Sequence, residues 1–200
     1  MKLRKIRKKV RVYFEITGLS EIARRYFVMN AFDGALTMLG IIIGAFVSGV
    51  IDHMIIISTG IAASLAMGIS GVSGAYMTEK AERIRDLKEL ESALLIDLKA
   101  TKHGKATRFA WFFAAFVDGA SPALAAMLVI SPFFLTAYGL ISEIQAFQAS
   151  LIMAFLLLFG LGAHLARTSD ESMWKYGIQM LIVGLITAVA CIGIALFLGR

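Results

Sequence analysis

Two aspartates lie inside runs of residues that are otherwise uncharged. Asp33 is the one charged residue between positions 26 and 51, and Asp118 is the one charged residue between positions 109 and 142. A charge in the middle of a membrane helix costs roughly 2.5–3.5 kcal/mol, so such a residue usually faces a cavity, a partner or an ion. We therefore predict that both aspartates lie on a transport path for cations or protons. A structural hydrogen bond to a neighbouring helix is the alternative.

The two aspartates share a short sequence echo. FDGALTML begins at Phe32 and FVDGASPAL begins at Phe116, and each places an Asp-Gly pair early in an apolar run. If the helices start near Tyr26 and Phe109, a rise of 1.5 Å per residue puts the aspartates about 10 and 13 Å deep. Two carboxylates in one layer would titrate as a coupled pair. Chance similarity is the alternative to this pairing.

The second apolar run, from residue 53 to 78, combines small residues with a methionine. Small residues let membrane helices approach closely, which is the simpler explanation of its stripe of Gly60, Ser64, Gly68, Gly71 and Gly74. Met67 offers a thioether, a soft ligand that transition metals accept. We assign Met67 to the candidate transport path, with apolar filling as the alternative.

A charged insert follows, and its carboxylates are sorted onto one face. At 100° per residue the side chains fall within an arc of about 80° for Glu79, Glu82, Asp86, Glu89 and Asp97. Oxygen ligands of this kind suit Mn²⁺ and Fe²⁺. We predict a metal-binding surface formed by Glu79, Glu82, Asp86 and Glu89. The alternative is a solvated face whose acids pair with basic residues three or four positions away.

Five apolar runs must position these groups. The chain of 200 residues is 58% hydrophobic with a mean hydropathy of +0.78, and about 20 apolar residues span a bilayer. The runs cover residues 26–51, 53–78, 109–142, 144–166 and 176–199. They predict an all-α integral membrane protein with five transmembrane helices and an amphipathic cytosolic helix between the second and third. Pro132 is expected to end or kink the third.

Basic residues set the expected orientation and division of the chain. Nine Lys/Arg lie in residues 1–25, eight between 80 and 108, two between 167 and 175, and one at 200. Basic residues favour the cytosolic side, so we predict a cytosolic N-terminus and an external C-terminus in the cell membrane of a prokaryote. The expected parts are a basic segment (1–25), helices one and two (26–78), an acidic insert (79–105) and helices three to five (106–200). The basic segment is either a stretch lying on anionic lipid or an ordinary positive flank.

Several functional classes find no support. The basic residues are not interleaved with stacking aromatics, which argues against nucleic acid as a partner. No Walker A loop, Cys-x-x-Cys, paired-histidine metal motif or Gly-x-Ser-x-Gly is present, so we predict no enzymatic activity and no bound cofactor. Cys191 is a lone cysteine and is expected to be a packing residue. The scattered histidines 53, 103 and 164 are expected to lie at the interfaces.

The chain resembles the vacuolar iron transporter family. The resemblance rests on AFDGALTMLGIIIGAF, LAMGISGVSGAYMTEKAERIRDLKELE, LLLFGLGAHLAR and YGIQMLIVGLITAVACIGIALFLG. It implies a homodimer of five-helix subunits that exports Fe²⁺ or Mn²⁺ from the cytosol in exchange for protons. By position, Asp33 matches the family's membrane aspartate, and Glu79, Glu82 and Glu89 lie where its cytosolic glutamates bind metal.

The chain departs from this family in helix two. A Ser-Met pair and a Gly-Glu-Tyr are common in the family, whereas this chain has Ser70-Gly71 and Gly74-Ala75-Tyr76. Asp118 is not expected from the family, and we hypothesise that it supplies the lost carboxylate and pairs with Asp33. The rival interpretation of the whole chain is a membrane scaffold or accessory subunit that transports nothing and whose acidic insert binds a protein.

Overall fold

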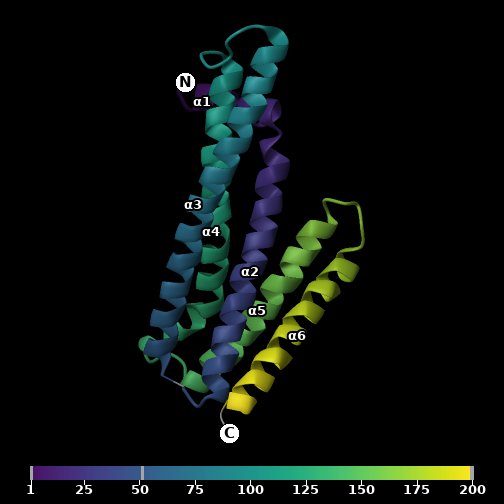
Figure 1. The fold of residues 1–200 in the computed structure, drawn as a ribbon. Helices are drawn as coiled ribbons and strands as arrows, with labels where there is room; N and C mark the ends of the chain where they lie inside the picture. Colours follow the sequence, from purple (N-terminus) through teal and green to yellow (C-terminus); the bar gives the residue numbers. More distant parts are fainter. Residues whose placement is uncertain (1, 51, 199–200) are drawn as a thin grey trace. The chain divides into compact units, whose positions relative to one another are not determined.

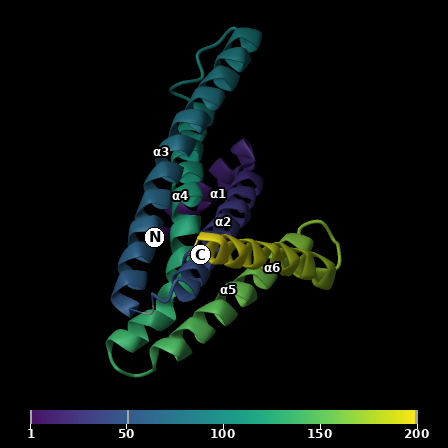
Figure 2. The same cartoon turned by 60° about the horizontal axis from the view of Figure 1, so that its bottom comes forward.

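The computed structural model describes residues 2–50 and 52–198, and the secondary structure in this part is helical. Six helices follow one another, as Figures 1 and 2 show: α1 (Lys2–Thr17), α2 (Leu19–Val47), α3 (His53–Leu94), α4 (Lys102–Ala137), α5 (Glu143–Ala166) and α6 (Met173–Leu198). The last five are long and apolar enough to cross a membrane. The prediction of an all-α integral membrane protein with five spanning helices is therefore confirmed.

The acidic insert does not form a helix of its own. Helix α3 runs without a break for 42 residues, which is about 63 Å at 1.5 Å per residue and about twice the hydrocarbon thickness. No glycine or proline lies between Glu79 and Leu94, so nothing in the sequence stops the helix where the charges begin. The insert is thus an extension of α3, followed by a turn at residues 95–101 and the start of α4 at Lys102.

The chain divides into two compact units, of which the first comprises Met1–Phe27 and Gly68–Ala120. Within it, the charged part of α3 and the first part of α4 run side by side in opposite directions (Figure 2). Their backbones meet at glycines: a Cβ added to Gly71 would lie 2.8 Å from the Cα of Gly119. One turn further along α3, the rings of Tyr76 and Phe112 are 5.3 Å apart between centroids.

The second unit comprises Val28–Met67 and Ser121–Arg200. Its apolar core is built from α2, α3, α4 and α5 with Ala188 of α6, and it includes the fully buried side chains of Met38, Leu39, Ile56, Ile130 and Phe133. Helices α5 and α6 form an antiparallel hairpin (Figure 1). Three small residues of α6, namely Gly177, Gly184 and Ala188, are its buried positions in the described part, so most of this helix is left to lipid or to a partner.

Pro132 does not end α4, which continues to Ala137. A proline inside a helix leaves the carbonyl four residues earlier without its N–H donor. Here that carbonyl belongs to Leu128, and the Ser131 hydroxyl donates to it over 2.7 Å. The helix ends at Ala137, and the turn after it contains Gly139, whose φ of 70° few other residues adopt easily. The N–H groups of Gly139 and Leu140 bond back to the last turn, so the five residues after Pro132 remain helical.

We predict that a methyl group at Gly162 destabilises the hairpin of α5 and α6. A Cβ there would lie 2.5 Å from the Tyr176 carbonyl oxygen, whereas a Cβ at Gly160 meets nothing within 4 Å. Overpacking of this kind typically costs about 1–3 kcal/mol. Gly162→Ala should therefore lower the thermal midpoint in detergent, while the matched change Gly160→Ala leaves it unchanged or higher. Equal midpoints for the two variants would contradict the close contact between Gly162 and Tyr176.

Candidate functional site

Asp33 lies on the outward face of α2 in the second unit. Its side chain is exposed on the surface of the single chain, and so are those of Met29 and Thr37, four positions before and after it. Residues four apart lie on the same face of a helix. No hydrogen bond or ion pair joins the Asp33 carboxylate to any other residue in the described ranges. A thioether, a carboxylate and a hydroxyl thus form one stripe on a helix that crosses the membrane.

The same face of α2 continues as a strip of small residues. A Cβ at Gly40 would lie 3.4 Å from the sulfur of Cys191 in α6, and a Cβ at Gly44 would meet nothing within 4 Å. Ser48 is exposed at the end of the strip. Cys191 is half-buried, as expected for a packing residue. Beyond the contact of Gly40 with α6, the strip is therefore open at Gly44 and Ser48.

Asp118 lies in the first unit, where α4 meets α3. Its carboxylate is held against Gly71, because a Cβ added there would come within 3.0 Å of Oδ2. The neighbouring Gly119 packs so closely that a Cβ would strike the backbone of α3 at Gly68 and Val72. Asp118 is half-buried. Since Asp33 belongs to the other unit, their pairing stays a prediction.

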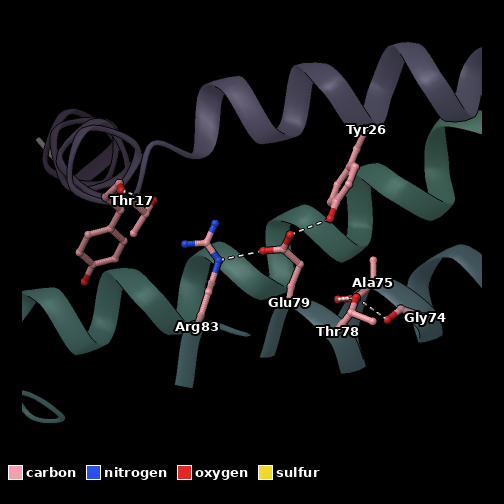
Figure 3. A network of polar contacts seen from close by, with 8 residues as sticks. Thr17, Tyr26, Gly74, Ala75, Thr78, Glu79 and Arg83 are labelled. Carbon is pink, nitrogen blue, oxygen red and sulfur yellow. Dashed lines mark hydrogen bonds and ion pairs between the residues drawn. The ribbon is translucent and has the colours of Figure 1, made fainter. Parts of the chain in front are cut away.

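Glu79 is a buried member of a polar cluster. One oxygen, Oε1, accepts a hydrogen bond from the Tyr26 hydroxyl over 2.7 Å, and Oε2 accepts one from Nε of Arg83 over 2.9 Å, as Figure 3 shows. The side chains of Glu79 and Arg83 are 6% and 11% exposed. Both carboxylate oxygens are therefore engaged within the protein, and the cluster ties the start of α2 to the extension of α3.

The other carboxylates of the insert remain exposed. Glu82, Asp86 and Glu89 follow one another along the solvated part of α3. Arg85 lies 3.5 Å from Asp86 and 3.7 Å from Glu89. Exposed pairs of this kind are worth little, so a cation can compete with the arginine. These three acids, without Glu79, are the accessible part of the predicted metal-binding surface.

Asp97 was expected on this acidic stripe, and that expectation is wrong. Helix α3 ends at Leu94, so Asp97 lies in the turn, where Oδ1 accepts a hydrogen bond from the Lys99 N–H over 2.8 Å. This bond lowers the pKa of the Asp97 carboxyl below its ordinary value. Glu91 bonds across the same turn to the Leu98 N–H, also over 2.8 Å. Both acids hold the connection to α4 in place.

Met67 packs against the apolar core of the second unit. This contact fits the alternative of apolar filling, although the ligand role stays a prediction. Among the histidines, His53 at the start of α3 is paired with Glu143 at the start of α5, with 2.8 Å between Nδ1 and Oε1. In the described part, no group of three or more His, Cys, Asp or Glu side chains converges as a ready metal site.

Four residues of these arrangements were not predicted as site residues. Met29 and Thr37 could have been found from their spacing of four around Asp33. Tyr26 and Arg83 could not have been found as easily, because the partner of Tyr26 lies 53 positions away. A tyrosine near the end of an apolar run is usually interpreted as an interface residue.

Comparison with known proteins finds a matching family model and a relative over most of the chain. The VIT family model matches residues 87–196, from the charged part of α3 to near the end of α6. An uncharacterized protein of Methanocaldococcus jannaschii is 32% identical over 176 residues, which cover 86% of this chain and 87% of the relative. No solved structure matches the chain. The family match covers more than half of the chain, and the relative extends the similarity to most of it.

We predict that Glu79→Gln destabilises the protein, whereas Glu82→Gln does not. Removing one partner of a buried ion pair typically costs about 3–5 kcal/mol, while exposed substitutions stay within about 0.5 kcal/mol. Thermal unfolding in detergent measures both variants. A stable Glu79→Gln protein that had lost metal binding would contradict the structural role and make Glu79 a ligand.

Proposed function

Because the chain belongs to the VIT family, we propose that this integral membrane protein moves a divalent transition metal ion, Fe²⁺ or Mn²⁺, out of the cytosol in exchange for protons. The observation that carries the proposal is the outward stripe of Met29, Asp33 and Thr37 on α2. Carboxylate and hydroxyl oxygens with one thioether suit ions of intermediate softness. A carboxylate in this position can also take up a proton after the metal leaves.

The same stripe supports a homodimer. An ionised carboxylate that faced the hydrocarbon core would be strongly destabilising. Ionisable residues in membrane helices therefore face the interior of a helix bundle or a water-filled cavity. Two α2 helices that met across a shared axis would place both Asp33 side chains on one path. The open position at Gly44, where a Cβ would meet nothing within 4 Å, would let the two backbones approach.

The extension of α3 would collect the ion on the cytosolic side. Glu82 and Glu89 are seven positions apart, which is about 10 Å along a helix, too far for both to bind one ion. Each helix can therefore supply only part of a coordination shell. In a homodimer, a second extension could provide further oxygen ligands to the same ion, and exposed Glu82, Asp86 and Glu89 are suited to this role.

We predict that Asp33→Asn lowers proton-coupled flux about tenfold or more. The protein is reconstituted into liposomes that contain a metal-quenched dye, and Fe²⁺ or Mn²⁺ is added outside with and without an acidic interior. Losing a charged interaction of about 1.5–3 kcal/mol slows transport about tenfold or more. Asp170→Asn, the same change in an exposed turn, is the matched control and should transport like the parent. Parental flux in folded Asp33→Asn protein would show that Asp33 is not on the transport path, and no flux of either metal through the folded parent would favour the scaffold.

Asp118→Asn tests the compensation hypothesis separately. If Asp118 supplies the carboxylate that helix two lacks, Asp118→Asn should lower the flux about tenfold, as Asp33→Asn does. The double variant should then be no worse than either single variant, because residues that act as one unit are not additive. If Asp118→Asn transports at the parental rate while Asp33→Asn is slowed, the pairing is wrong and Asp118 serves the contact between α3 and α4.

A further inference from the structure

Helix α1 carries a dense positive charge that has few partners in the chain. Seven of its sixteen residues are Lys or Arg, and Glu15 is its one acid. Glu15 is paired with Arg11 at 3.0 Å. Within the described ranges, no carboxylate lies within ion-pair distance of the exposed Arg4, Arg7, Lys8 or Lys9. A surface with this density of positive charge attracts anionic partners from outside the chain.

The charged surface is held in place by the apolar side of α1. Tyr13 is buried and its ring lies 5.7 Å from that of Phe109, while the ring of Phe14 lies 5.1 Å from that of Phe113. Leu19, immediately after the turn, is fully buried among alanines of α4. Helix α1 is therefore docked on α4, and its basic side chains form a positioned surface.

Two hollows open on this surface. The smaller one, of about 340 Å³, is lined by residues of α1 and by the first residue of α4: Lys8, Lys9, Val12, Tyr13 and Lys102. A groove of about 840 Å³ continues along α1, lined by Arg4, Arg7, Lys8, Val10, Arg11 and Phe14. Lys8 borders both. Three lysines from two helices thus line one hollow together with an aromatic and an aliphatic side chain.

We propose that Lys8, Lys9 and Lys102 bind the phosphate headgroup of an anionic phospholipid, with the neighbouring arginine groove as its continuation. Lysine binds phosphate as a point charge, and basic residues beside a membrane attract anionic lipid. Only Gly18 separates α1 from the membrane-spanning α2, so the site stays at a bilayer surface. Val12 and Tyr13 supply the apolar walls that a headgroup with its glycerol requires. Tyr13 is buried and Nζ of Lys9 lies 5.6 Å from the centroid of its ring, so this ring is not available to stack on a nucleobase.

The test compares lipids and charge-matched variants of the full-length protein. Binding of phosphatidylglycerol and of phosphatidylcholine to the detergent-purified protein is measured by native mass spectrometry, with the shift in thermal midpoint as a second readout. One variant combines Lys8→Gln, Lys9→Gln and Lys102→Gln. The control combines Lys88→Gln, Lys99→Gln and Lys175→Gln, three exposed lysines that line neither hollow. Both variants lose three positive charges.

We expect phosphatidylglycerol to bind at least tenfold more tightly than phosphatidylcholine. The first variant should lose that preference by tenfold to about 100-fold, while the control keeps it. Replacing the same three lysines by arginine should restore binding, which separates lost charge from a misfolded α1. Equal binding of the two lipids, or equal loss in both variants, would overturn the proposal. Displacement of the lipid by equimolar inorganic phosphate would also overturn it, in favour of a soluble anion.

Discussion

A helix that crosses hydrocarbon has no water to satisfy its polar groups, so each must find a partner within the protein. This constraint explains why α4 continues through Pro132, where the Ser131 hydroxyl takes over the carbonyl that the proline leaves without a donor. It also makes Asp33 informative. Its carboxylate is exposed and has no partner in the described chain, so the single chain does not satisfy the constraint. A second copy, an ion or a proton must complete it.

The close contact between the backbones of α3 and α4 determines the position of a carboxylate as well as the packing of the two helices. At the glycine contact between α3 and α4, the absence of a side chain at Gly71 leaves the space beside which the Asp118 carboxylate lies. A larger residue at position 71 would displace that carboxylate from its present rotamer. The departure from the family at Gly71 and the unexpected Asp118 are therefore linked by geometry. The carboxylate that helix two lacks belongs at Ala75, about one turn further along α3, so the contact at Gly71 places Asp118 beside α3 and leaves its pairing with Asp33 to the transport assay.

The sequence predicts the spanning helices well because apolar runs of this length have few other uses in a chain. It predicts their ends less well, since the boundary between lipid and water does not stop a helix whose residues favour helix, as in the extension of α3. The roles of individual side chains are even harder to predict from the sequence. Glu79 and Glu82 share one stripe by spacing, yet Glu79 is buried because Tyr26, far away in sequence, approaches it. Periodicity reports which residues share a face, and only the packed structure reports which face is covered.

The first unit keeps its opposite charges apart. Basic residues gather on α1 and the start of α4, while the exposed acids Glu82, Asp86 and Glu89 lie on the extension of α3 with Arg85 beside the last two. If the two surfaces neutralised each other, neither would attract a ligand. Exposed charges are screened beyond about 8 Å at physiological salt, so each surface acts locally. Under the proposed function, anionic lipid would hold α1 at the membrane while the acidic stripe stayed available to cations that arrive from the cytosol.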